Sequence, residues 1–259
     1  MNGRIFLALA LLPTALAQQQ ISFVSCPIVR DTKSVPCFLA EDEGETYFLA
    51  IQQDIRAEQY PPQLLHEVLV EGTVAPGPRV CGGIPLKPIH LSVLPEVNLA
   101  CNTILPAEPG IDPPPHRRPA GPSTRNIPAD APPEPAPAPP ERFAPPFKER
   151  EFTIDYDFDS AFLFMNDTAV VRQAASFVNA AKAKSVEITA HRAAVLLSNG
   201  NVMTENENIA QRRAEAVADL LGGLGVDQSS ITVRVAPDVA KPDGISDPDH
   251  RIVSIRVTP

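Results

Sequence analysis

A proline-rich stretch divides the 259-residue sequence into two parts that must build separate cores. Residues 105–150 hold more than half of the 30 prolines and few aliphatic side chains. Such a segment buries too little apolar surface to offset the entropy of ordering its chain, and proline favours extended polyproline II geometry. We therefore expect residues 105–150 to form a disordered linker between two folded domains.

The N-terminus has the features of a secretory signal peptide. A basic residue, a short apolar run and a small-residue motif that ends at Ala17 predict that residues 1–17 are removed on export. A lipoprotein signal with Cys26 as the lipidated residue is the alternative, although glutamines interrupt the run that leads into that cysteine. No later segment reaches the roughly 20 apolar residues of a transmembrane helix. We expect a periplasmic protein, with association to the outer membrane as a further option.

All four cysteines precede the proline-rich stretch. They are Cys26, Cys37, Cys81 and Cys101. An even number in an exported protein favours two disulfides over a metal site, and none of the spacings is a CxxC pair. Three connectivities are possible, and the sequence leaves all three open.

Residues 20–104 read as short strands separated by turn residues. The segment FLAEDEGETYFLAI has two apolar runs around a polar turn, and HEVLVEGTV places Val68, Val70 and Val74 on one face at a period of two. We expect a small all-β domain of barrel or sandwich type, stapled by disulfides, with an OB-like barrel as one candidate.

Residues 151–259 alternate between strand and helix patterns. EFTIDYDF, SVEITAH, SITVRVA and HRIVSIRVT read as strands. One helix follows a cap at Asn166 or Asp167, and a second begins near Thr204 and stops at glycines. The order β-α-β-α-β-β predicts an α+β sandwich with both helices on one face of a mixed sheet.

An extra hairpin is expected between the second strand and the second helix. The segment VLLSNGNVM places Asn199-Gly200 between two apolar runs. Asn-Gly is the strongest short hairpin signal, and a type I′ turn requires positive φ at both residues. We therefore predict a β-hairpin over residues 194–203.

Four sequence motifs in this half lie at or near the ends of the predicted strands and helices. They are Phe158-Asp159-Ser160-Ala161 after the first strand, His191 at the end of the second, the run Asn206-x-x-Ile209-Ala210-x-Arg212-Arg213-Ala214 and Arg251 before the last strand. With these motifs, residues 151–259 resemble the OmpA-like C-terminal domain family. That family folds as the same sandwich and binds peptidoglycan without cleaving it, by gripping diaminopimelate of the stem peptide. The resemblance implies a non-catalytic cell-envelope protein that associates with the peptidoglycan stem peptide and uses no cofactor or metal, with Arg213, Asn206, His191 and Arg251 as ligand-binding residues.

One departure from the family changes the charge of the implied site. The family ends its second strand Gly-His-Thr-Asp, and the aspartate receives the ammonium group of diaminopimelate; here the residues are Ala190-His191-Arg192-Ala193. The carboxylate is missing and a positive charge is added. Glu205 or Glu207 could supply a substitute if the hairpin folds back over the start of the helix. His191 is expected to act mainly in packing.

The side chain of Arg213 needs an anion whether or not a ligand binds. It shares a helical stripe with Ile209 and Val217, and a charge removed from water without a partner is costly. Its partner is either a ligand or a structural carboxylate, for which the candidates are Asp157, Asp159 and Glu205.

Two function classes are disfavoured. The net charge of −9 argues against a nucleic-acid partner, and no HExxH, GxSxG or paired catalytic carboxylates indicate an enzyme. The alternative to peptidoglycan association is a degenerate OmpA-like domain that serves as a structural or protein-interaction module in the envelope.

Overall fold

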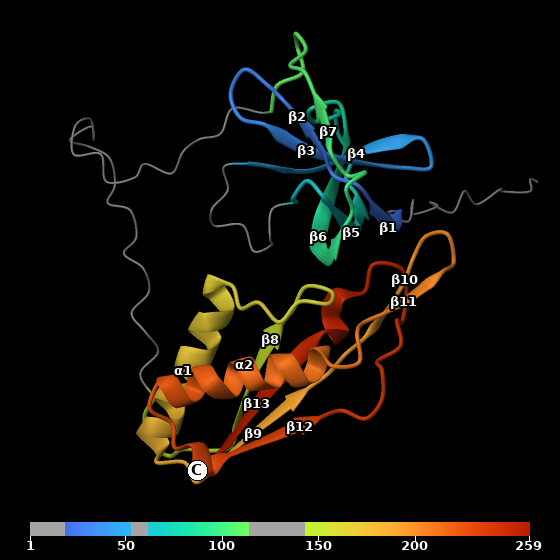
Figure 1. Cartoon of the computed structure of the whole chain (residues 1–259). Helices are drawn as coiled ribbons and strands as arrows, with labels where there is room; N and C mark the ends of the chain where they lie inside the picture. The colour runs from blue at the N-terminus through green and yellow to red at the C-terminus, as the bar shows by residue number, and fades with distance from the viewer. Residues whose placement is uncertain (1–18, 53–61, 114–142) are drawn as a thin grey trace, which may run out of the picture.

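A computed structural model describes residues 19–52, 62–113 and 143–259, which form two parts in contact with each other (Figure 1). The predicted signal peptide and the central part of the predicted linker lie outside the described residues. Among the described helices, none has the length and apolar character needed to cross a membrane.

Residues 19–52 and 62–113 form one seven-stranded sheet in the order β1-β5-β6-β4-β3-β2-β7 (Figure 1). The strands are β1 Gln20–Ser25, β2 Ile28–Arg30, β3 Cys37–Asp42, β4 Glu45–Ile51, β5 His66–Val74, β6 Ile84–Val97 and β7 Thr103–Leu105. The sheet curls, so that β1 contacts β3 and the Phe23 ring lies 5.3 Å from that of Tyr47. Val68 and Val70 of β5 enter this core, as their period of two predicts.

Disulfides join Cys26 to Cys101 and Cys37 to Cys81, and no described cysteine is free. The prediction of two disulfides is confirmed, and the connectivity that the sequence left open is now assigned. Each disulfide links strands or turns far apart in the chain, with separations of 75 and 44 residues. Disulfides of this kind are typical of an oxidising compartment outside the cytoplasm.

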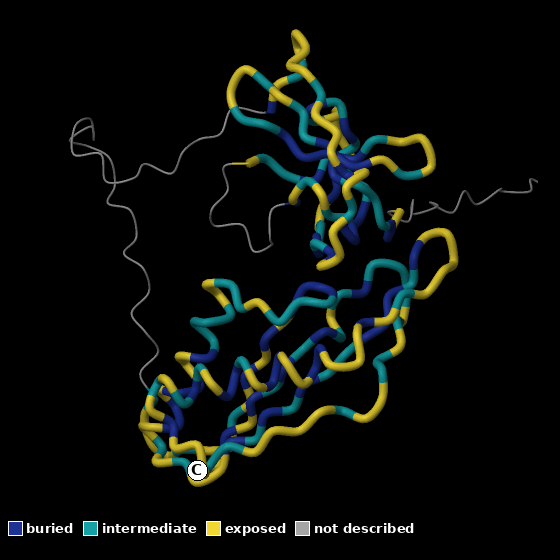
Figure 2. The backbone as a smooth tube through the Cα atoms, viewed as in Figure 1, coloured by how far each residue is buried: buried dark blue, intermediate teal, exposed yellow. Residues whose placement is uncertain are grey.

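The second part is a four-stranded sheet with two helices on one face. Its elements are β8 Arg150–Asp155, α1 Met165–Ala181, β9 Ser185–Ala190, β10 Ala194–Leu196, β11 Val202–Thr204, α2 Ile209–Gly223, the 3-10 turn η1 Gln228–Ser230, β12 Ile231–Val235, the 3-10 turn η2 Pro248–His250 and β13 Ile252–Thr258. The sheet order is β12-β9-β13-β8, with β12 parallel to β9 and β13 antiparallel to both neighbours. Figure 2 shows β12 exposed along the outer edge, whereas every second residue of β9 and β13 is buried.

The helix α1 begins at Met165 with Phe164 as its cap residue, so the prediction of a cap at Asn166 or Asp167 was wrong, and both residues lie in the first turn. The Asp167 side chain accepts a hydrogen bond from the backbone N–H of Phe164, one of the donors that the helix itself leaves unpaired. The helix α2 also begins elsewhere than predicted, at Ile209 and not near Thr204. Thr204 pairs with Ala194 in the hairpin, which removes it from the helix.

The predicted hairpin is present as β10 and β11, but its turn differs from the prediction. Gly200 has a φ of 85°, whereas Asn199 is not among the described residues with positive φ. The backbone N–H of Gly200 donates to the carbonyl of Leu197, and the Asn199 side chain accepts from the backbone N–H of Asn201. These contacts describe a three-residue loop with glycine in the left-handed position, so the type I′ prediction was wrong.

Both described ends of the predicted linker pack against a folded part. Ile111 contacts the cluster around the Cys37–Cys81 disulfide. On the other side, Phe143 and Phe147 pack edge-on against Phe177 of α1, with centroid distances of 5.0 and 6.0 Å. The linker boundaries drawn from composition therefore include residues that the structure places on the two cores.

Candidate functional site

Arg213 lies on the buried face of α2, on the same side as Ile209 and Val217. Its side chain is completely buried, and its guanidinium carbon lies 4.9 Å from the centre of the Tyr156 ring. Helical spacing predicted this placement on the apolar face. A buried guanidinium requires acceptors for all of its N–H groups.

Every nitrogen of the Arg213 guanidinium donates to a protein acceptor. Nη1 donates to Glu205 Oε2 at 3.1 Å and Nη2 donates to Glu205 Oε1, which together form a two-pronged contact. Backbone carbonyls accept the remaining bonds: Ser160 from Nε at 2.8 Å, His191 from Nη1 at 3.1 Å and Asp157 from Nη2 at 2.9 Å. Five bonds use the full donor capacity of an arginine.

Glu205 is fixed by four donors. Besides the two from Arg213, the backbone N–H of Ala193 donates to Oε2 at 2.8 Å and that of Asp159 donates to Oε1 at 3.0 Å. The Glu205 side chain is as fully buried as that of Arg213. Because β11 ends at Thr204, the next residue turns back toward Ala193. Of the carboxylates that the sequence offered to Arg213, the structure selects Glu205.

Asn206 lies at the exposed rim of this cluster. Its backbone N–H donates to Asp159 Oδ1 at 2.6 Å and its side-chain amide donates to Oδ2 at 3.0 Å. Burial raises the pKa of Asp159, while the hydrogen bond from the Asn206 backbone opposes that shift. Asp159 has a φ of 54°, so the chain turns sharply where β8 leads toward α1.

His191 joins the Arg213–Glu205 cluster through its backbone groups, and Arg192 joins it through its guanidinium. The His191 carbonyl accepts from Arg213, and its N–H donates to the carbonyl of Ile252. Arg192 Nη1 donates to the backbone carbonyl of Glu205 at 3.2 Å. The predicted residues Arg213, Asn206 and His191 are thus brought together around Glu205.

Arg251 does not join this cluster. It is buried at the end of η2, where Nη2 lies 2.6 Å from Oε2 of Glu71 and Nε donates to the carbonyl of Tyr156. Glu71 belongs to β5 of the N-terminal sheet and is also completely buried. Glu71 was missed by sequence reasoning, although an acidic residue directly after the apolar run at residues 68–70 was a signal that could have found it.

The Glu71–Arg251 pair lies in a contact between the two parts of the chain. Leu69 and Leu94 of the N-terminal sheet pack against Phe158, Val195 and Leu197. The Ser92 hydroxyl accepts a 2.8 Å bond from the backbone N–H of Phe158. Strand β5 is therefore buried on both faces, one in its own core and the other against the second part.

The tip of the β10–β11 hairpin lies next to β1 (Figure 1) and bonds to it at one residue, Ser22. The N–H of Ser22 donates to Ser198 Oγ at 2.9 Å, and the N–H of Ser198 donates to the carbonyl of Ser22 at 2.7 Å. Ser22 belongs to β1, which has a partner strand on one side only. The backbone N–H and C=O of Ser22 point away from β5, and Ser198 provides a hydrogen-bond partner for each of them.

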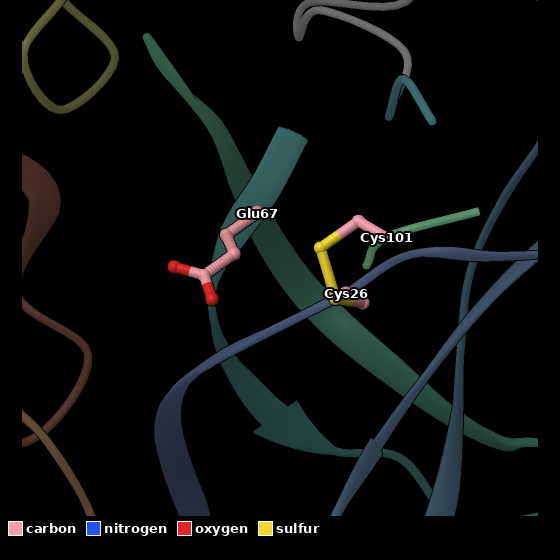
Figure 3. Close-up of side chains that lie close together, drawn as sticks. All are labelled: Cys26, Glu67 and Cys101. Carbon is pink, nitrogen blue, oxygen red and sulfur yellow. A yellow bond between two sulfur atoms is a disulfide. The ribbon is translucent and has the colours of Figure 1, made fainter. Parts of the chain in front are cut away.

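Two groups of described side chains have the composition of metal ligands. Cys26, Glu67 and Cys101 lie together, but the two sulfurs are bonded to each other (Figure 3), so neither can act as a thiolate ligand. Glu67 instead accepts a bond from the Asn98 side chain. The second group is formed by Asp243, Asp247 and His250, where Asp247 already accepts from a backbone N–H and pairs with His250.

Solved structures similar to this chain include three envelope domains. The OmpA-like domain of FopA1 from Francisella tularensis subsp. tularensis SCHU S4 has 23% identity and a TM-score of 0.34, with 42% of this chain and 71% of that chain covered. The peptidoglycan-associated lipoprotein of Burkholderia pseudomallei has 22% identity and a TM-score of 0.34, with 41% and 90% covered. The periplasmic domain of Helicobacter pylori MotB has 12% identity and a TM-score of 0.33, with 43% and 74% covered. No family model and no curated protein matches the chain. These identities and TM-scores are low, so the function has to be inferred from the contacts of this chain.

Proposed function

We propose that the protein is an exported, non-catalytic protein of the cell envelope whose C-terminal part serves as a structural module for protein contacts. The observation that carries this proposal is the pairing of Arg213 with Glu205. A guanidinium whose donors all reach protein acceptors, and whose side chain is completely buried, has no group left for a ligand. An external carboxylate would first have to displace Glu205 and leave it buried without its partner.

The contact between the two parts supports the same proposal. Arg251, which the resemblance to the OmpA-like family placed in a ligand site, instead binds Glu71 of the N-terminal sheet. The hairpin that replaces the shorter family loop bonds to β1. The Arg251 contact and the hairpin contact thus lie at one intramolecular interface, as expected of a domain that holds the N-terminal sheet in place.

Co-sedimentation of the mature protein with isolated sacculi tests the proposal. We expect the wild type to stay in the supernatant under conditions where an OmpA-like domain that binds peptidoglycan is pelleted. Salt-resistant pelleting of the folded wild type would contradict the proposal.

Peptidoglycan association is the second candidate, and one observation favours it. The Arg213 guanidinium and the backbone N–H groups of Ala193 and Asp159 form a set of donors, here called the Arg213 cradle. The bound Glu205 shows that this cradle holds a carboxylate through two parallel bonds from the guanidinium and one from each N–H. A stem-peptide carboxylate has the same donor requirements. If this candidate is right, Glu205→Ala should increase sedimentation with sacculi, and a second substitution Arg213→Ala should abolish the gain. Glu207→Ala, in the exposed part of the same loop, is the matched control.

A further inference from the structure

A pocket of about 390 Å³ lies beside β8. It is formed by β8, the start of α1 and the turn η2, and His90 of β6 closes one side. Four carboxylates line it: Asp155, Asp157, Asp167 and Asp249. No lysine or arginine is among its lining residues.

His90 is the only basic side chain among the residues that line this pocket. His90 Nε2 lies 3.1 Å from Oδ1 of the buried Asp157. Within the described ranges, no salt bridge joins Asp155, Asp167 or Asp249 to a lysine or arginine. Burial raises the pKa of Asp155 and of Asp167, and neighbouring carboxylates add to both shifts. A bound cation would relieve this repulsion.

A second and independent feature is the hydroxyl of Tyr156. Tyr156 lines the pocket, is 2% exposed, and its hydroxyl has no hydrogen-bond partner among the described residues. Burial raises the pKa of this hydroxyl, the Arg213 guanidinium opposes that shift, and the Asp167 carboxylate adds to it. Buried hydroxyls are nearly always hydrogen-bonded, so an unpartnered one that borders a pocket indicates a missing donor or acceptor.

The shape and spacing of the site favour an organic cation over a metal ion. Neither of the two described groups with metal-ligand spacing includes a residue of this pocket. The volume exceeds that needed for one water or ion, and Phe164, Val170 and Pro248 supply apolar surface. Apolar walls suit an aliphatic stem and carboxylates suit a terminal ammonium.

We propose that this pocket binds an aliphatic ammonium group, as carried by a free diamine or by the lysine side chain of a peptide. Asp155 and Asp167 accept from the ammonium, the Tyr156 hydroxyl donates to or accepts from the ligand, and Val170 contacts the stem. The proposal does not depend on whether the Arg213 cluster binds peptidoglycan.

Calorimetric titration of the mature full-length protein at neutral pH tests the site. The ligands are cadaverine, Nα-acetyl-lysine amide and, as a control without the charge, Nα-acetyl-norleucine amide. We expect at least one ammonium ligand to bind about tenfold or more tightly than the norleucine control. Preference for cadaverine identifies a free diamine as the source, and preference for the lysine derivative identifies a peptide side chain. Equal or absent binding of all three would overturn the proposal.

Two variants separate binding from folding. Asp167→Asn retains an oxygen that can accept from the Phe164 N–H but removes the charge, and should weaken the preferred ligand about tenfold. Tyr156→Phe removes a hydroxyl that has no described partner, so ligand binding should weaken while the Tm of the free protein does not fall. Asp219→Asn, on the exposed face of α2, is the control and should bind as the wild type does. Wild-type affinity in both Asp167→Asn and Tyr156→Phe would refute the assignment.

Discussion

Replacing Glu205 with alanine should destabilise the C-terminal part strongly, because this side chain satisfies four buried donors. Two belong to Arg213 and two are the backbone N–H groups of Ala193 and Asp159. Removing one partner of a buried ion pair leaves an uncompensated charge and costs about 3–5 kcal/mol. Domains of this size have a free energy of unfolding of about 5–15 kcal/mol, so the loss is a large fraction of the total.

Urea unfolding with the disulfides intact measures this loss. The described helices α1 and α2 both belong to the C-terminal part, so circular dichroism at the helix band reports its unfolding. For a slope of about 2 kcal/mol per M urea, a loss of 3–5 kcal/mol lowers the midpoint by about 1.5–2.5 M. Arg213→Ala should give a loss of similar size, because it leaves Glu205 buried and unpaired.

The control for this experiment is Glu207→Ala. Glu207 lies two residues further along the same loop and is exposed, so its removal should change the free energy of unfolding by less than about 0.5 kcal/mol. A loss below about 1 kcal/mol for Glu205→Ala would refute the reasoning, since water would then be replacing the carboxylate at little cost. It would also show that the Arg213 cradle can open, which favours the peptidoglycan candidate.

Three further predictions concern the interface and the acidic pocket. Glu71→Ala should lower stability by about 3–5 kcal/mol, because Arg251 is left buried without its carboxylate, and heat-denaturation scans of the full chain should show this as a lower Tm. Ser198→Ala removes the acceptor for the Ser22 N–H and should cost about 1 kcal/mol; hydrogen exchange at that amide should become faster, and unchanged exchange would contradict the contact. Asp155→Asn should raise the Tm at neutral pH, because burial raises the pKa of this carboxyl and the folded state therefore favours its uncharged form. Protonation supplies the same gain to the wild type as the pH falls through that raised pKa, so the difference between variant and wild type should vanish in acid.

The parts of the fold that depend on local pattern could be predicted from the sequence. Period two located the strand around Val68 and Val70, and helical spacing placed Arg213 on the buried face of α2. Export and an even cysteine count predicted two disulfides, but connectivity depends on which strands meet in space.

Features set by contacts between distant segments were not predictable in the same way. The segment from Thr204 to Asn208 offers several residues suited to a helix cap, and hairpin pairing decides that α2 begins only at Ile209. Glu71 lies on the face of β5 opposite Val68 and Val70, and the second part of the chain covers that face. No local periodicity reports a contact made across 180 residues.

The bond between Ser198 and Ser22 has a consequence for solubility. An edge strand with free N–H and C=O groups is a template on which another chain can add a strand, and β1 is such an edge. In this protein the hairpin tip occupies the edge of β1 at Ser22 and so hinders the addition of another strand. Any change that separates the two parts, even one that leaves both cores intact, would expose β1 together with the apolar side chains of Leu69 and Leu94. Self-association would then begin before either core unfolds.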